Sequence, residues 1–364
     1  MMDSELSGEQ SETLYPPGRG SARFKHSWKG NTARTFFSAA HHLGLFPALR
    51  RRLPANLSVL AYHRIVDPDR SGYYGLKGNV SATPSAFETQ LDYLMGECNV
   101  ISLDEILELV TDGKPLPENA VLITFDDGYR DNYTTALPAL ARRGLPAVLF
   151  AATGFVDGLV CPFWDWVIEA FRISEKERAA LPLLGIRAWR TANEREAVGA
   201  EWIKASMMCP HLEFRRALRE LSRAIEVPLP AAPPPGLMMN WDELKAMTEG
   251  GFAIGAHSAT HPVLLRTSPD RARREIEISK ALLEQRTNSR VTSFAFPNGL
   301  FSTLHEGMLK TAGYTFGFRV EGGLALTREI RERPFAIRRT CITLKDDLPR
   351  FIAKVGGVAR LLLW

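Results

Sequence analysis

The sequence predicts an α/β fold, namely a distorted (β/α) barrel of about seven strands that is interrupted by one large, mostly helical insertion. Short apolar runs of strand length alternate with segments of helical periodicity, and strands separated by helices form parallel sheets with right-handed crossovers. The alternation breaks off between 155 and 236, and so long a segment between two strands is typical of a functional lid or an added subdomain, with structural filler as the alternative.

The first half of the predicted barrel contains three buried strands. Ser102 and Glu105 form a capping box at the start of one of the helices between them, and Gly144 closes the other. The predicted elements are strand 57–61, helix 103–110, strand 120–125, helix 132–143 and strand 147–151.

The second half resumes after the insertion with another capping box. Asn240 caps a helix over 241–249, with Glu243 at the box position, and two glycines end it before a strand at 252–255. The remaining predicted elements are helix 269–285, strand 292–296, helix 302–312, strand 315–320 and strand 335–340.

These elements divide the chain into five predicted regions. The barrel extends over 57–345 and contains the insertion 155–236. Before it lie a disordered polar and basic tail, 1–34, and an amphipathic helical lead-in, 35–56, which either packs on the core or lies on a membrane surface. A C-terminal amphipathic helix, 346–364, follows the barrel.

Composition excludes some classes of protein. The net charge is +4, from 45 basic and 41 acidic residues spread along the chain, so no basic patch for nucleic acid is expected. The N-terminus lacks the apolar segment of a signal peptide, no run is apolar enough to cross a membrane, and the four cysteines are far apart. We therefore expect a cytoplasmic protein that can attach peripherally to the inner face of the membrane through its terminal amphipathic segments.

Two adjacent carboxylates are the first candidate for chemistry. Asp126 and Asp127 follow a buried strand and precede Gly128, where the chain can turn sharply. One carboxylate can bind a cation while its neighbour accepts a proton from bound water, and these residues alone do not decide which does which. An ordinary Asp-Asp-Gly turn is the alternative.

A pair of histidines at the end of a later strand is the second candidate. His257 and His261 are four residues apart, a spacing that places both rings on one face of a helical turn, where they can share a metal. Two histidines and one aspartate at strand ends of one barrel supply three ligands and leave a position open for water. That arrangement is typical of a catalytic rather than a structural metal site.

These two motifs resemble those of the polysaccharide deacetylases of carbohydrate esterase family 4, the group with the NodB homology domain. The stretches Thr124-Phe125-Asp126-Asp127-Gly128 and His257-Ser258-Ala259-Thr260-His261 match its first and second motifs. The resemblance implies that Asp126 is the catalytic base and that Asp127, His257 and His261 bind a divalent metal. Zinc is the default for mixed nitrogen and oxygen ligands, with cobalt, nickel or iron as alternatives.

Weaker resemblances add further residues. The stretch 294–299 is similar to the third motif, in which the backbone N–H of Asn298 would stabilise the oxyanion and Pro297 would border the substrate, but Ala295 stands near the place of the family's arginine. The stretch 60–65 resembles a signature of the exopolysaccharide branch, and it would place His63 at the barrel mouth.

The last motif departs most from the family. Its leaving-group histidine is absent, because the corresponding strand reads Phe335-Ala336-Ile337-Arg338-Arg339-Thr340. An arginine is a poor general acid, so Arg338 or Arg339 is expected to orient Asp126 or to bind substrate, with Arg338 taken as the catalytic candidate. His63 becomes the candidate acid.

The resemblance implies metal-dependent hydrolysis of N-acetyl groups on a polysaccharide, an oligosaccharide or a lipid-linked glycan. The alternatives are a weak or inactive glycan-binding homologue and an amidase for a small non-glycan amide. In the insertion, Trp164 and Trp166 offer flat faces that can stack on sugar rings, or else they form the insertion's own core.

Overall fold

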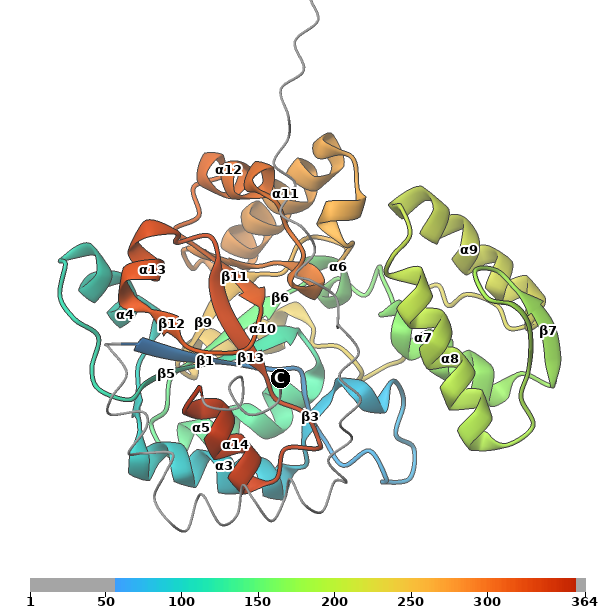
Figure 1. The fold of residues 1–364 in the computed structure, drawn as a ribbon, viewed down its shortest axis with the longest axis horizontal. Coiled ribbons are helices and arrows are strands. Elements are labelled where there is room, and N and C mark those ends of the chain that lie inside the picture. Colours follow the sequence, from blue (N-terminus) through green and yellow to red (C-terminus); the bar gives the residue numbers. More distant parts are fainter. Residues whose placement is uncertain (1–55, 358–364) are drawn as a thin grey trace, which may run out of the picture.

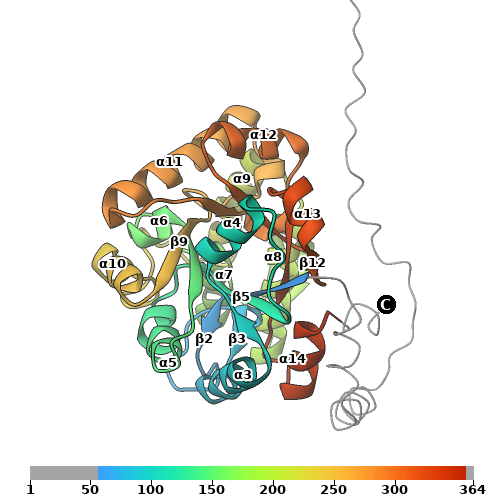
Figure 2. The ribbon, with the colours of Figure 1, turned by 90° about the vertical axis from the view of Figure 1, so that its left-hand side faces the viewer.

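The computed structural model describes residues 56–357, and within them parallel strands close into a seven-stranded barrel (Figures 1 and 2). Going round the barrel, the strands are β1 (Asn56–Tyr62), β13 (Ile337–Cys341), β11 (Phe316–Val320), β10 (Ser293–Ala295), β9 (Phe252–Ala256), β6 (Ala147–Ala151) and β5 (Ala120–Asp127). Strand β5 pairs with β1 and so closes the barrel. In this pairing Leu57 lies opposite Ala120 and Tyr62 lies opposite Phe125. The predicted fold class is confirmed.

Short strands extend the barrel at its edges. Strand β12 (Ala325–Leu326) pairs antiparallel with the start of β1, and β4 (Asn99–Val100) pairs parallel with β5. A separate pair, β2 (Arg64–Ile65) and β3 (Val80–Ala82), follows β1.

Helices cover the outside of the barrel (Figure 2). Buried side chains fill its interior. Phe150 and Phe318 come from β6 and β11, which are not neighbours, and their ring centroids lie 5.2 Å apart across the interior. The covering helices are α3 (Pro84–Glu97), α4 (Leu103–Thr111), α5 (Leu137–Ala141), α6 (Thr153–Val156), α10 (Trp241–Glu249), α11 (Pro269–Thr287), α12 (Thr303–Thr311), α13 (Thr327–Glu332) and α14 (Leu348–Val355).

Some predicted elements differ from those observed. The helix expected over 132–143 is a π-helical segment, Asn132–Ala136, followed by α5, because Pro138 has no N–H to continue the α-helical ladder. The helix expected over 346–364 ends at Val355. The tail 1–34, the lead-in as far as residue 55, and residues 358–364 lie outside the described residues.

The segment between β6 and α10 contributes a lobe that stands beside the barrel in Figure 1. Its own hydrophobic core includes Trp166, Phe171, Trp189 and Trp202. The elements of the lobe are α7 (Phe163–Ile173), β7 (Arg178–Leu181), β8 (Gly185–Ala188), α8 (Ala192–Ser206) and α9 (His211–Ala224). Within 56–357, none of the helices has the length and apolar character to span a membrane.

A buried carboxyl joins this lobe to the barrel. Asp165 on α7 accepts hydrogen bonds from the Leu76 backbone N–H, at 2.7 Å, and from the Tyr129 hydroxyl, also at 2.7 Å. Burial raises the pKa of Asp165 to about 7, and the nearby Arg64 opposes that shift. The folded protein therefore holds a proton on Asp165 at pH values where the unfolded chain has lost it.

We predict that this carboxyl makes stability fall as the pH rises towards 7. The pKa of Asp165 is higher in the folded protein than the unfolded value of 3.8. Its contribution to the free energy of unfolding is therefore complete below pH 3.8 and is lost as the pH rises through about 7. The slope is at most about 1.4 kcal/mol per pH unit. In urea unfolding between pH 5 and 8, Asp165→Asn should lose this dependence, whereas the exposed control Asp270→Asn should keep it. An equal pH slope in all three proteins would contradict the assignment.

Candidate active site

The two adjacent carboxylates lie at the carboxyl end of β5, as the sequence predicts. Both side chains are buried, with exposures of 2% for Asp126 and 1% for Asp127. Asp127 has φ 75°, a left-handed conformation that few residues other than glycine adopt, and Gly128 follows with φ 93°. Such strained backbone is frequent at functional sites, where the surrounding structure holds it in place.

The two histidines follow β9, but they do not lie on a helical turn. Residues 257–263 form a loop in which Ser258 and His261 have positive φ, and the Ser258 hydroxyl accepts a hydrogen bond from the His261 backbone N–H at 3.0 Å. The expectation of a helical turn was therefore wrong, because the left-handed residues fold the chain back on itself. Both rings nevertheless face the same point, with their Nε2 atoms 3.2 Å apart.

The orientation of His257 is set by the neighbouring strand. Its Nδ1 lies 2.7 Å from the carbonyl oxygen of Ala295, which can only accept a hydrogen bond, so Nδ1 carries the proton and Nε2 presents its lone pair. Burial lowers the pKa of His257 to about 4, against the opposing charge of Asp126, so the ring is neutral at pH 7. A neutral, oriented imidazole is the form that binds metals.

Asp127, His257 and His261 form a buried group with the geometry of a metal site. Their potential ligand atoms all lie within 4.8 Å of one another. Asp127 Oδ1 is 3.6 Å from His257 Nε2 and 3.3 Å from His261 Nε2, and this oxygen has no hydrogen-bond partner among the described residues. A buried carboxylate oxygen without a donor, facing two imidazole nitrogens, fits a divalent cation.

The other carboxylate is held by an arginine from across the barrel. Arg339 on β13 is fully buried and binds Asp126 through two parallel hydrogen bonds of 2.6 and 2.7 Å. It also donates to the Thr124 hydroxyl at 3.2 Å, and its guanidinium lies 5.1 Å from the centre of the Phe150 ring. Burial alone would raise the pKa of Asp126, but Arg339, followed by His257, holds that pKa far below its usual value.

The choice of Arg338 as a catalytic candidate was wrong. Its side chain lies on the other face of β13, where it pairs with Glu321 and Glu329 at 3.3 Å each, because successive residues of a strand point to opposite sides. Ile337, two residues before Arg339, packs in the barrel interior and indicates that Arg339 shares that face. This alternation of inward and outward residues along the strand could have identified Arg339 from the sequence.

The remaining barrel residues predicted for the site lie at the same end. His63 follows β1 and lies close enough to the two carboxyls to contribute to the lowered pKa of both Asp126 and Asp127. Asn298 adopts φ 57° in the turn Pro297–Gly299 after β10, and Asn298 and His261 line one pocket. Pro297 itself is buried in that turn.

Neither predicted tryptophan offers a face to a sugar. Trp164 and Trp166 are each 4% exposed and belong to the core of the lobe. The ring of Trp164 packs edge-on against His261, with centroids 4.8 Å apart, and its N–H donates to the Tyr129 hydroxyl at 2.7 Å. Trp166 donates to the Pro228 carbonyl oxygen. The stacking assignment was therefore wrong, and Trp164 instead supports a candidate metal ligand.

Comparison with known proteins gives sequence matches to part of the chain. The family profile described as "Polysaccharide deacetylase" matches residues 113–176 and 204–317. The Bacillus subtilis (strain 168) protein YxkH, a polysaccharide deacetylase by name, is 36% identical over 105 residues, which are 28% of this chain and 34% of that protein. The Escherichia coli (strain K12) poly-beta-1,6-N-acetyl-D-glucosamine N-deacetylase is 46% identical over 57 residues, 16% of this chain and 8% of that enzyme.

Solved structures share the fold over most of the chain. The Streptococcus pyogenes deacetylase PplD, solved in complex with acetate, is 17% identical with a TM-score of 0.55, and the match covers 83% of this chain and 99% of that one. IcaB from Ammonifex degensii is 19% identical with a TM-score of 0.53, covering 83% and 97%. The family profile and both sequence relatives agree, so the matched part of the chain is similar to the polysaccharide deacetylase family.

Proposed function

We propose that the chain is a metal-dependent deacetylase that hydrolyses N-acetyl groups of amino sugars in a polysaccharide, an oligosaccharide or a lipid-linked glycan. The observation that carries the proposal is the pair of adjacent carboxylates in different settings. Asp126 is held by Arg339, whereas Asp127 faces two histidine nitrogens. A base beside a cation site is what metal-assisted hydrolysis of an amide needs.

Asp127, His257 and His261 would hold the divalent ion, with zinc as the default and cobalt, nickel or iron as alternatives. When bound, such an ion makes water more acidic and polarises the carbonyl of the substrate. The protein's own part is to fix these ligands. The Ala295 carbonyl orients His257, and the Trp164 ring packs against His261.

The reaction adds water to the carbonyl carbon of the acetamide and then breaks its carbon–nitrogen bond. Asp126, kept ionised by Arg339, accepts the proton that the water gives up. The Asn298 N–H would stabilise the oxyanion. The leaving nitrogen must take up a proton, for which His63 is the candidate donor, and the products are acetate and a free amine.

The substrate would be an acetylated glycan, a proposal supported by the family and by the named substrate of the Escherichia coli relative. Because the chain matches 34% of the length of one curated relative and 8% of the other, activity and substrate remain proposals. The cytoplasmic location and the peripheral contact with a membrane stay predictions.

The function is tested by acetate release from a panel of N-acetylated oligosaccharides and lipid-linked sugars, with and without added zinc. We expect acetate only with metal and only from acetylated amino sugars. A metal-loaded protein that binds these glycans but releases no acetate would favour the glycan-binding homologue. Release from small non-glycan amides alone would favour the amidase.

The same substitution at the two carboxylates should have opposite effects on metal. Asp127→Asn should lose most of the bound metal, because it removes a charged ligand. Asp126→Asn should keep one metal per chain and lose turnover by roughly 100-fold or more. Metal analysis and acetate release on both variants check this. If Asp126→Asn were the variant without metal, the two roles would be reversed.

The neighbouring arginines provide a second matched pair. Arg339→Lys keeps the charge but loses the two parallel hydrogen bonds to Asp126, so we expect kcat to fall about tenfold or more while bound metal is unchanged. Arg338→Lys changes only the pairs with Glu321 and Glu329 and should lower kcat less than twofold. Equal losses of kcat in the two variants would argue against a positioning role for Arg339.

A further inference from the structure

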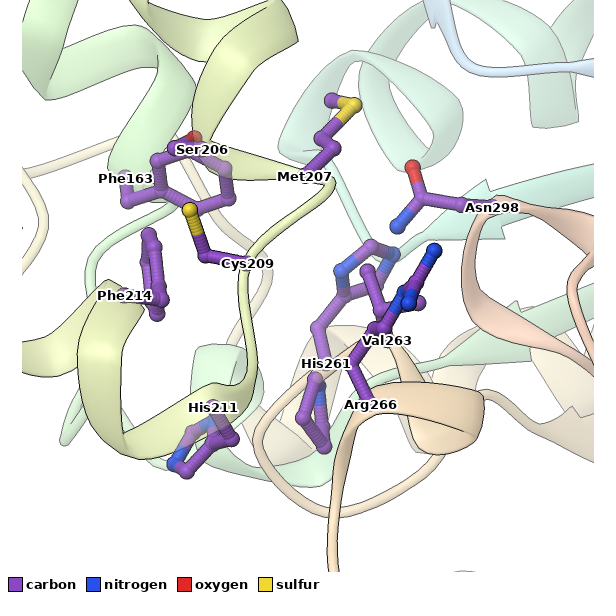
Figure 3. A pocket seen from close by; sticks show the side chains of 11 residues that line it. Phe163, Ser206, Met207, Cys209, His211, Phe214, His261, Val263, Arg266 and Asn298 are labelled. Atoms are coloured by element: carbon purple, nitrogen blue, oxygen red, sulfur yellow. The ribbon is translucent and has the colours of Figure 1, made fainter. Parts of the chain in front are cut away.

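A pocket between the lobe and the barrel begins at the candidate metal ligand His261 (Figure 3). The lobe contributes apolar walls from Phe163, Met207 and Phe214, and the barrel side contributes His261, Arg266 and Asn298. Because His261 belongs to both, the pocket adjoins the candidate metal site, and a group of the substrate next to its acetamide can contact it.

Arg266 is the unusual member of the lining. In the described part of the chain its guanidinium has no carboxylate partner, and its Nε is a buried atom without a hydrogen-bond acceptor. Figure 3 shows its side chain beside His261 and Asn298. Most buried polar groups have a partner, so an unmatched guanidinium inside a pocket indicates that a ligand supplies the acceptor.

The charges around Arg266 also favour an anionic ligand. Among residues 56–357, no aspartate or glutamate side chain lines the pocket, so the positive charge of Arg266 is not balanced by a carboxylate of the lining. On the lobe side, burial is the main cause that lowers the pKa of His211 to about 4, and the nearby charges of Arg271, which is paired with Glu275, and of Arg215 act in the same sense. Arg266 is the arginine that lines the pocket itself, and its positive charge there favours a negative group.

We propose that Arg266 recognises an anionic substituent, a phosphate or a carboxylate, carried by the substrate next to its N-acetylated sugar. The inference rests on the proposed function and narrows its substrate class. The planar guanidinium can bind the oxygens of such a group in pairs, and Phe163, Met207 and Phe214 pack against the apolar faces of the same ligand. A phosphodiester of a lipid-linked sugar and the carboxylate of a uronic acid share this chemistry.

The test compares wild type with Arg266→Gln and with Arg273→Gln, an exposed residue of α11 whose replacement removes the same charge. The substrates are the neutral methyl glycoside of N-acetylglucosamine, its 1-phosphate, and its disaccharide with glucuronic acid. We expect wild type and Arg273→Gln to prefer at least one anionic substrate in kcat/KM by about tenfold or more, and Arg266→Gln to reduce that preference to about twofold or less. The two anionic substrates distinguish phosphate from carboxylate.

Two results would overturn the proposal, namely no anionic preference in wild type, or a preference that Arg266→Gln retains. If no substrate releases acetate, the proposed function fails, and calorimetric binding of inorganic phosphate and of glucuronate then decides about Arg266. Binding that is lost in Arg266→Gln and kept in Arg273→Gln supports the anion site. Absent binding, or equal binding in all three proteins, rejects it.

Discussion

The buried ion pair between Asp126 and Arg339 is the interaction on which the candidate site depends. It joins β5 to β13 inside the barrel, and both side chains are almost wholly removed from solvent. Removing either partner would leave an uncompensated charge in the interior, which is far more costly than losing an exposed pair. The pair is therefore both a cross-strand tie and the means by which Asp126 stays ionised beside the cation site.

The metal ligands are fixed from two directions. The barrel orients His257 through the Ala295 carbonyl, and the lobe supports His261 through the Trp164 ring. Trp164 is in turn hydrogen-bonded to Tyr129, which donates to the buried Asp165. The lobe is thus connected to the site by contacts and is not merely adjacent to it, and the same lobe supplies the apolar wall of the pocket beside His261.

The closed barrel could be predicted from the sequence, because strand periodicity is a local signal. The proximity of Asp126, Asp127, His257 and His261 could also be predicted, because the carboxyl ends of parallel strands meet at one end of a barrel. The sequence did not distinguish Arg339 from Arg338, since choosing between adjacent strand residues requires knowing which face is inside. The burial of Trp164 and Trp166 also depends on tertiary packing within the lobe, which single-residue chemistry does not reveal. The unpaired state of Arg266 could be found only once its neighbours were known.

In the proposed site, one divalent cation binds Asp127, His257 and His261 while Asp126 stays outside its coordination sphere. Anomalous diffraction from crystals of the zinc-loaded protein, recorded on both sides of the zinc absorption edge, tests it directly. We expect one peak at about 2.0 to 2.2 Å from Asp127 Oδ1 and from Nε2 of both histidines, with the Arg339 contacts to Asp126 intact. A peak coordinated by Asp126 in place of Asp127, or no peak at this site in zinc-loaded protein, would contradict it.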